Sequence, residues 1–163
     1  MKQWFAAYTN PRAEKSVFNQ LQKKEIEVFL PTQKVLKQYK KRKKKVEEVL
    51  FKSYIFVRIT KTKFFEVIKT QGIVRIISFE GTPVPVPDIQ IEIVKRLINN
   101  EIIFDVEDII FSKGDCVEII DGVLKGLKGI LINNKGNHKV AMALDSLNKS
   151  IIVEIDRRQL RNL

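Results

Sequence analysis

Apolar positions in the first part of the chain switch between the two-residue period of strands and the longer period of helices. Residues 4–8 and 54–59 are short runs rich in aromatic and β-branched side chains, which predicts two buried strands. Between them, Ala13, Val17 and Leu21 recur at four-residue steps. This spacing predicts a helix over residues 12–24, which Asn10 would cap and Pro11 would open.

The same alternation continues to about residue 99. We expect strands over 25–30 and 73–79 and helices over 63–69 and 88–99. The alternating prolines of residues 81–87 predict an extended connector outside any sheet, because proline disfavours both helices and ladder hydrogen bonds. The predicted fold class of this part is α+β, a sandwich with helices on one face of a sheet.

The last part of the chain is rich in predicted strands, expected over residues 117–120, 129–132, 140–144 and 151–155, with a short fifth at 158–160. Cys116 is expected to point into the core, and His138 is expected in a turn over residues 133–138. So many short strands predict a small closed β-barrel.

The charge pattern further predicts that the chain has two domains and an anionic partner. The formal net charge is +11. Cations dominate the first part, whereas residues 101–108 carry acids and no base. We therefore expect a domain over residues 1–99, an acidic linker over 100–112 and a second domain over 113–163. The cationic excess points to nucleic acid or another anionic surface as a partner.

The cations concentrate between Lys34 and Lys45, where the chain has eight lysines and arginines and no acid. Such a run must form a solvated loop or a hairpin tip. It serves either solubility alone or contact with phosphates, and its density favours phosphate contact. Tyr39 is the one aromatic residue in the run, so we expect attraction to the backbone more than base stacking. The predicted contacts are Lys37, Lys40, Lys41, Arg42, Lys43, Lys44 and Lys45.

The sequence offers no set of residues suited to catalysis. With one cysteine and one histidine, the chain can form neither an intrachain disulfide nor a four-cysteine zinc site. It lacks the glycine-rich loops that bind nucleotide phosphates. We expect no enzymatic activity, no metal and no cofactor. We also expect a cytoplasmic protein without membrane contact, because no long apolar run or signal-peptide pattern is visible.

Two groups of residues resemble a known family. Residues 4–8 (WFAAY), Glu14-Lys15 and residues 50–57 (LFKSYIFV) resemble the N-terminal NGN domain of NusG-type transcription factors. The second group resembles the KOW motif of the same factors and of some ribosomal proteins, and it comprises Gly114, Asp115, Val117, Gly122, Gly126 and Gly129. Over its whole length the chain is similar to NusG-like elongation and antitermination factors, and most of all to the RfaH and UpxY paralogues.

This resemblance implies an antiparallel NGN sandwich followed by a five-stranded, SH3-like KOW barrel. It implies a monomeric factor that binds the clamp helices of the largest catalytic subunit of RNA polymerase. Such a factor suppresses pausing or termination, on specific operons such as capsule polysaccharide loci. The polymerase-binding residues carried over by the resemblance are Tyr8, Tyr54, Phe56, Phe79 and Ile91.

The resemblance also implies contacts outside that patch. The KOW domain would bind a ribosomal protein, through Leu147, or Rho. Residues 61–66, which should touch the opposite lobe of the polymerase, match no family motif, and Lys52 stands where the family has proline. The cations expected to face DNA or RNA in the elongation complex are Arg12, Lys15, Lys23 and Lys24.

Several alternatives stay open from the residues themselves. The aromatic residues of the predicted strands either pack in the core or form an exposed partner surface. The alternative function is a KOW-type protein that binds RNA or the ribosome, with the basic run gripping ribosomal RNA. Some RfaH-like proteins refold the KOW domain as helices, but the β-branched run 151–155 predicts strands here.

Overall fold

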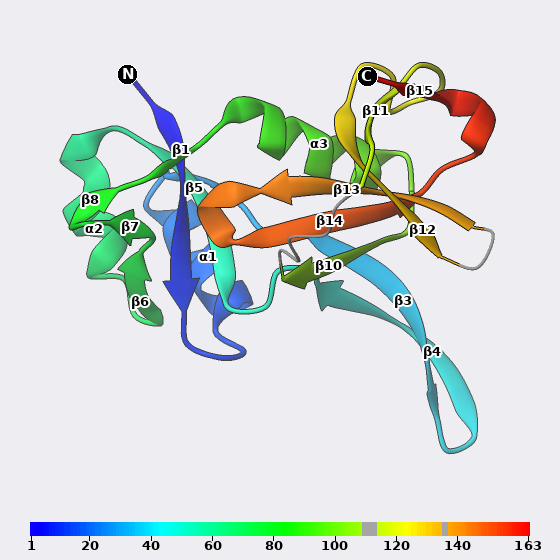
Figure 1. Ribbon diagram of the computed structural model, residues 1–163. Coiled ribbons are helices and arrows are strands. Elements are labelled where there is room, and N and C mark those ends of the chain that lie inside the picture. Colours follow the sequence, from blue (N-terminus) through cyan, green and yellow to red (C-terminus); the bar gives the residue numbers. More distant parts are fainter. Residues whose placement is uncertain (109–113, 135–136) are drawn as a thin grey trace. The chain divides into compact units, whose positions relative to one another are not determined.

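A computed structural model describes residues 1–108, 114–134 and 137–163 of the chain (Figure 1). Its contacts divide the chain into two compact units, residues 1–88 and 89–163. The first unit contains β1 (Gln3–Thr9), α1 (Glu14–Lys23), β2 (Glu27–Phe29), β3 (Thr32–Tyr39), β4 (Arg42–Val49), β5 (Tyr54–Ile59), η1 (Lys61–Lys63), α2 (Phe64–Ile68), β6 (Ile73–Ile76), β7 (Ser78–Phe79), β8 (Thr82–Pro83) and β9 (Pro85–Val86). The second contains α3 (Asp88–Asn99), which begins at the division, β10 (Phe104–Asp108), β11 (Cys116–Ile119), β12 (Lys128–Asn134), β13 (Asn137–Leu144), η2 (Asp145–Leu147), β14 (Lys149–Glu154), η3 (Arg157–Gln159) and β15 (Leu160–Asn162).

The main sheet of the first unit has the strand order β2–β5–β1–β6, and β9 also pairs with β1. The strand pairs β1–β5, β1–β6, β1–β9 and β2–β5 are antiparallel. Alternate residues of β1 and β5, such as Phe5, Ala7 and Val57, pack on one face with Val17 of α1 and Val67 of α2. The sheet and the helices on one of its faces confirm the α+β sandwich predicted for this part.

The first helix begins later than predicted, and Asn10 does not cap it. Arg12 has a positive φ of 64°, so the chain turns before the helix and Ala13 becomes the N-cap residue. The buried carboxylate of Glu14 lies in the first turn and accepts a hydrogen bond from the backbone N–H of Ser53 at 3.1 Å. This bond joins the start of α1 to the turn that precedes β5.

The sequence predicted that the proline-rich segment is a connector outside any sheet, and this prediction was wrong. Pro83 of β8 pairs with Ser78, and Pro85 of β9 pairs with Phe5 of β1. Between them, the backbone N–H of Val84 donates to the carbonyl of Ile77 at 3.1 Å. Prolines are tolerated in strands at sheet edges, where no ladder donor is needed. The predicted strand 73–79 is accordingly divided into β6 and β7.

The second unit is built on an antiparallel sheet with the order β10–β14–β13–β12–β11–β15. Four of the predicted strands correspond to β11 to β14, and residues 149–154 are a strand, as the β-branched run predicted. The predicted fifth strand at 158–160 lies mostly in η3, and β15 begins at Leu160. The first strand, β10, was not predicted. It lies inside the expected acidic linker, where Phe104 is buried and pairs with Val153.

The linker prediction overlooked an alternation in this acidic stretch. Phe104 and Val106 lie two residues apart, so both can point to the core side of the sheet, while Asp105 and Glu107 point to the other side. The end of the strand is also tied to β14, because the Lys149 ammonium contacts Asp108 at 2.6 Å. Residues 109–112 of the predicted linker and Lys113 lie outside the described residues, and the boundaries at 99 and 113 stay predictions.

Two further expectations for the second unit were wrong. Cys116 is exposed, because strand alternation turns the neighbouring Val117 into the core instead. His138 belongs to β13 and pairs with Asn133, because the β12–β13 ladder continues to its last pair, Asn134 with Asn137. Among the helices of the described residues, none has the length and apolar character needed to cross a membrane.

Candidate nucleic-acid and partner interfaces

The predicted basic run forms a two-stranded hairpin. Strands β3 and β4 pair in register from Thr32 opposite Val49 to Tyr39 opposite Arg42, and Lys40-Lys41 make the turn. In the described part of the chain they pair with each other and with no other strand. All residues from Leu36 to Lys45 are exposed. Of the two structures predicted for the run, a loop or a hairpin tip, the hairpin is the one formed.

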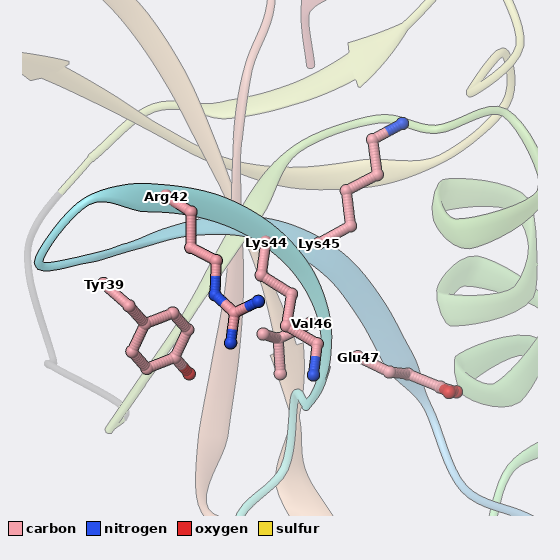
Figure 2. Close-up of a pocket in the computed structure, with 6 residues that line it drawn as sticks. All are labelled: Tyr39, Arg42, Lys44, Lys45, Val46 and Glu47. Atoms are coloured by element: carbon pink, nitrogen blue, oxygen red, sulfur yellow. The ribbon is translucent and has the colours of Figure 1, made fainter.

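Cations occupy both faces of this hairpin. Directly opposed residues of an antiparallel pair share a face, so the register assigns each side chain. One face carries Val35, Lys37, Tyr39, Arg42, Lys44 and Val46, and the other carries Lys34, Leu36, Gln38, Lys43, Lys45 and Glu47. Figure 2 shows Tyr39, Arg42 and Lys44 on one side of the ribbon, with Lys45 pointing away from them. Side chains of both faces border an open hollow of about 510 Å³.

The positive charge of the hairpin is largely uncompensated. Lys37 stands directly opposite Lys44, an arrangement that destabilises a strand pair. Within the described residues, Lys37 is the one cation of the run with an ion pair, at 3.7 Å from Glu48. Both partners are exposed, so this pair contributes little. The hairpin therefore has a strong positive field that the protein itself does not neutralise.

Hydrogen bonds at Glu47 join the two strands at the base of the hairpin and link the base to α1. The Glu47 carboxylate accepts a hydrogen bond from the Thr32 hydroxyl at 2.6 Å. The Lys15 ammonium of α1 donates to the Glu47 carbonyl at 3.4 Å. The base is therefore hydrogen-bonded to α1, and every residue from Leu36 to Lys45 is exposed.

The four predicted cations around the first helix do not have equal freedom. Arg12 and Lys23 are exposed and available to an anion. Lys15 is bound to the hairpin base. The Lys24 ammonium donates to the Thr70 hydroxyl at 2.9 Å and to the Glu66 carbonyl at 3.4 Å, which ties the end of α1 to α2. Their contact with nucleic acid stays a prediction.

Tyr8 and Tyr54, two of the predicted polymerase contacts, lie side by side on the sheet. They are register partners on β1 and β5, their ring centroids are 5.5 Å apart, and both side chains are half-buried. Arg75 of β6 pairs with Tyr8 from the other side, and its guanidinium lies 5.7 Å from the ring centroid. We call Tyr54, Tyr8 and Arg75 the tyrosine row. Sequence reasoning missed Arg75, because only the pairing of β1 with β6 places it there.

The other three predicted polymerase contacts lie elsewhere. Phe56 is 1% exposed and packs between the rings of Phe29 at 6.2 Å and Phe51 at 5.7 Å. Ile91 is 2% exposed in α3, and Phe79 is 70% exposed at the end of β7. For Phe56 the core alternative is the one the packing supports. Of these three side chains, Phe79 is the one available to a partner.

The residues of the KOW motif shape the second unit. Gly122 and Gly126 have positive φ values of 85° and 93°, which glycine adopts most easily. A Cβ at Gly129 would lie 2.6 Å from the Ala141 carbonyl oxygen, so this position needs close backbone approach. Gly114 and Asp115 are exposed before β11, where Val117 is fully buried. Leu147, the predicted ribosomal contact, is 5% exposed in η2.

The described residues also lack the spacing of side chains that a metal site needs. Across residues 1–108, 114–134 and 137–163, no three His, Cys, Asp or Glu side chains are placed to hold a metal ion.

Comparisons with known proteins identify the family. The family model described as transcription termination factor NusG matches residues 2–95. Transcription termination/antitermination proteins NusG of Streptococcus pyogenes serotypes M3 and M1 are 28% identical over 141 residues, which span 85% of this chain and 78% of theirs. A solved structure of Thermotoga maritima NusG is similar in fold, with a TM-score of 0.61 at 21% identity, over 100% of this chain and 98% of that one. Since the family model covers more than half of the chain, the protein belongs to the NusG family of transcription termination and antitermination factors.

Proposed function

We propose that this protein binds transcribing RNA polymerase and suppresses pausing or termination, as a specialised factor for particular operons such as capsule polysaccharide loci. The observation that carries the proposal is the NusG family match over residues 2–95, which includes both the tyrosine row and the basic hairpin. The chain would act by binding and not by catalysis. Residues 1–99 would bind polymerase, and the KOW residues 113–163 of the second unit would bind a ribosomal protein or Rho.

The tyrosine row is the proposed centre of the polymerase contact. Tyr8 and Tyr54 are half-buried and their rings pack against each other, so each side chain is held in place while part of it stays accessible. Tyrosine and arginine are enriched at protein interfaces, because they combine a large apolar surface with a polar end. Phe79, exposed on β7, adds an apolar side chain from the same unit. The partner surface would be the clamp helices of the largest polymerase subunit.

Co-purification with core RNA polymerase tests this contact. We expect Tyr8→Ala/Tyr54→Ala to weaken binding at least tenfold, since interface tyrosines often contribute more than about 1 kcal/mol each. Phe56 is left unchanged because its removal would disturb the core. Ile68→Ala is the matched control, because Ile68 is exposed on α2, away from the tyrosine row. Equal binding by a folded double variant would contradict the proposed patch.

A second function is favoured by the hairpin itself. A KOW-type protein that binds ribosomal RNA would also use a dense run of cations, with affinity that falls steeply with salt. Sedimentation of the full chain with ribosomes at low and moderate salt tests this alternative. Association with ribosomes that persists without polymerase and is lost in Lys43→Gln/Lys45→Gln would support it. Association that requires polymerase would exclude it.

A further inference from the structure

The β3–β4 hairpin presents positive charge in three directions. The turn carries Lys40 and Lys41. The cations of one face are Lys37, Arg42 and Lys44, and those of the other are Lys34, Lys43 and Lys45. An element that lies along a single phosphate backbone needs cations on one side only. Cations on both faces and at the end suit an element that enters between two rows of phosphates.

The hairpin also has the shape for such an entry. The major groove of B-form DNA is about 12 Å wide and admits a two-stranded β-ribbon. Here the ribbon is two strands wide, since within the described residues no third strand joins it. Both faces are uncovered from Leu36 to Lys45. The ribbon can therefore be surrounded by a groove without rearrangement of the fold.

Other nucleic acids fit these features less well. The major groove of duplex RNA is deep and narrow, and side chains cannot read it. Proteins that hold single strands rely on aromatic side chains that stack on successive bases, and Tyr39 is the one aromatic residue between Lys34 and Lys45. Duplex DNA is the partner that matches the charge and the shape together.

We propose that the hairpin inserts its Lys40-Lys41 turn into the major groove of double-stranded DNA, with its two faces against the two phosphate backbones. The proposal rests on the nucleic-acid contact predicted for the basic run, and it names the partner and the mode of entry. Phosphates on the face that carries Lys37 and Lys44 would relieve the repulsion between these two lysines. Gln38 and Arg42, next to the turn on opposite faces, have the chemistry to bond adenine and guanine edges.

Binding of the full chain to a short fluorescent DNA duplex, without polymerase, tests the two-sided contact. The variants are Lys37→Gln/Lys44→Gln on one face and Lys43→Gln/Lys45→Gln on the other. Each pair should weaken binding about tenfold or more and reduce the slope of log affinity against log salt by about 2. The control Lys61→Gln/Lys125→Gln removes two exposed cations outside the hairpin and should stay near wild type. If only one of the two variant pairs weakens binding, the proposed insertion is wrong.

The identity of the groove is tested with a modified duplex. Glucosylated 5-hydroxymethylcytosine fills the major groove and leaves the phosphates in place, so we expect binding to drop at least tenfold. Equal affinity for modified and unmodified DNA would contradict binding in the major groove. Tighter binding to a single strand or an RNA duplex of the same sequence would overturn the partner while leaving the proposed polymerase function intact. No binding to any of these would also contradict the nucleic-acid contact predicted for the basic run, while leaving the polymerase contact to its own test.

Discussion

At the scale of single residues, the clearest electrostatic effect lies at Asp156. Its carboxylate accepts hydrogen bonds from the backbone N–H of Arg158 at 2.9 Å and from the Arg158 guanidinium at 3.2 and 2.9 Å. These bonds lower the pKa of Asp156 from 3.8 to about 2. Asp156 is also the N-cap of η3, which leads into β15. The bonds therefore shape the last turn before the chain joins β11.

The lowered pKa of Asp156 predicts a dependence of stability on acid. The folded state favours the charged carboxylate, so this contribution is present above pH 3.8 and is lost as the pH falls through about 2. Urea unfolding across this range should show a steeper loss of stability for the wild type than for Asp156→Asn. Asp105→Asn, at another exposed carboxyl of the second unit, should keep the wild-type slope. Parallel profiles for wild type and Asp156→Asn would contradict the assignment.

Gly129 gives a second prediction at this scale. A Cβ there would meet the Ala141 carbonyl oxygen and the Val140 side chain, both at 2.6 Å. Gly129→Ala should destabilise the second unit by about 2 kcal/mol or more, because neighbouring strands must move apart. Gly126→Ala is the comparison, since it meets nothing within 4 Å and adds only the strain of its positive φ, about 1–2 kcal/mol. Thermal unfolding measures both, and an equal loss would mean that close packing at Gly129 is unimportant.

At the scale of elements, the hairpin combines poor intrinsic stability with a strong positive field. A two-stranded ribbon is marginally stable on its own. Here like charges stand opposed at Lys37 and Lys44, and the hydrogen bond from Lys15 of α1 reaches the ribbon at its base, at the Glu47 carbonyl. An anion between or beside the lysines would add stability that the free chain lacks.

This conflict predicts opposite effects of one substitution on stability and on binding. Lys44→Glu replaces the repulsion with Lys37 by attraction and should stabilise the hairpin by about 0.5–1 kcal/mol. Amide hydrogen exchange in β3 and β4 should slow accordingly. The same substitution should weaken DNA binding more than Lys44→Gln, which removes the charge without reversing it. A variant that gains both protection and affinity would contradict this account.

At the scale of the whole molecule, the chain forms two compact units, and β10 extends the second sheet into a segment with the composition of a linker. Five residues of β10 pair with β14, and Phe104 is buried. The second unit therefore needs sequence that precedes the KOW motif. A boundary drawn only from charge would remove a strand from it.

Fragments that start on either side of β10 test this arrangement. Circular dichroism of a fragment over residues 101–163 should show mainly strand and a cooperative thermal transition. A fragment over residues 110–163 should be less stable by about 3 kcal/mol or more, because it lacks Phe104 and the ladder to β14. Equal stability of the two would mean that β10 adds nothing to the unit. A helical spectrum would contradict the strands themselves.

The sequence by itself determined the features that depend on a few neighbouring residues. The strands β1 and β5 and the helix α3 were predicted, because the patterns of apolar residues that indicate them are local properties. The family was recognised from motifs that are continuous in sequence, and the basic hairpin was recognised from a run of charge that cannot be buried.

Only the tertiary structure decided which distant residues meet and which are covered. Tyr8 and Tyr54 were both predicted as site residues, but Arg75 joins them through the pairing of β1 with β6. Phe56 shares strand β5 with Tyr54, yet the rings of Phe29 and Phe51 enclose it. Strand register and burial depend on partners far along the chain, and a local pattern carries no information on where those partners lie.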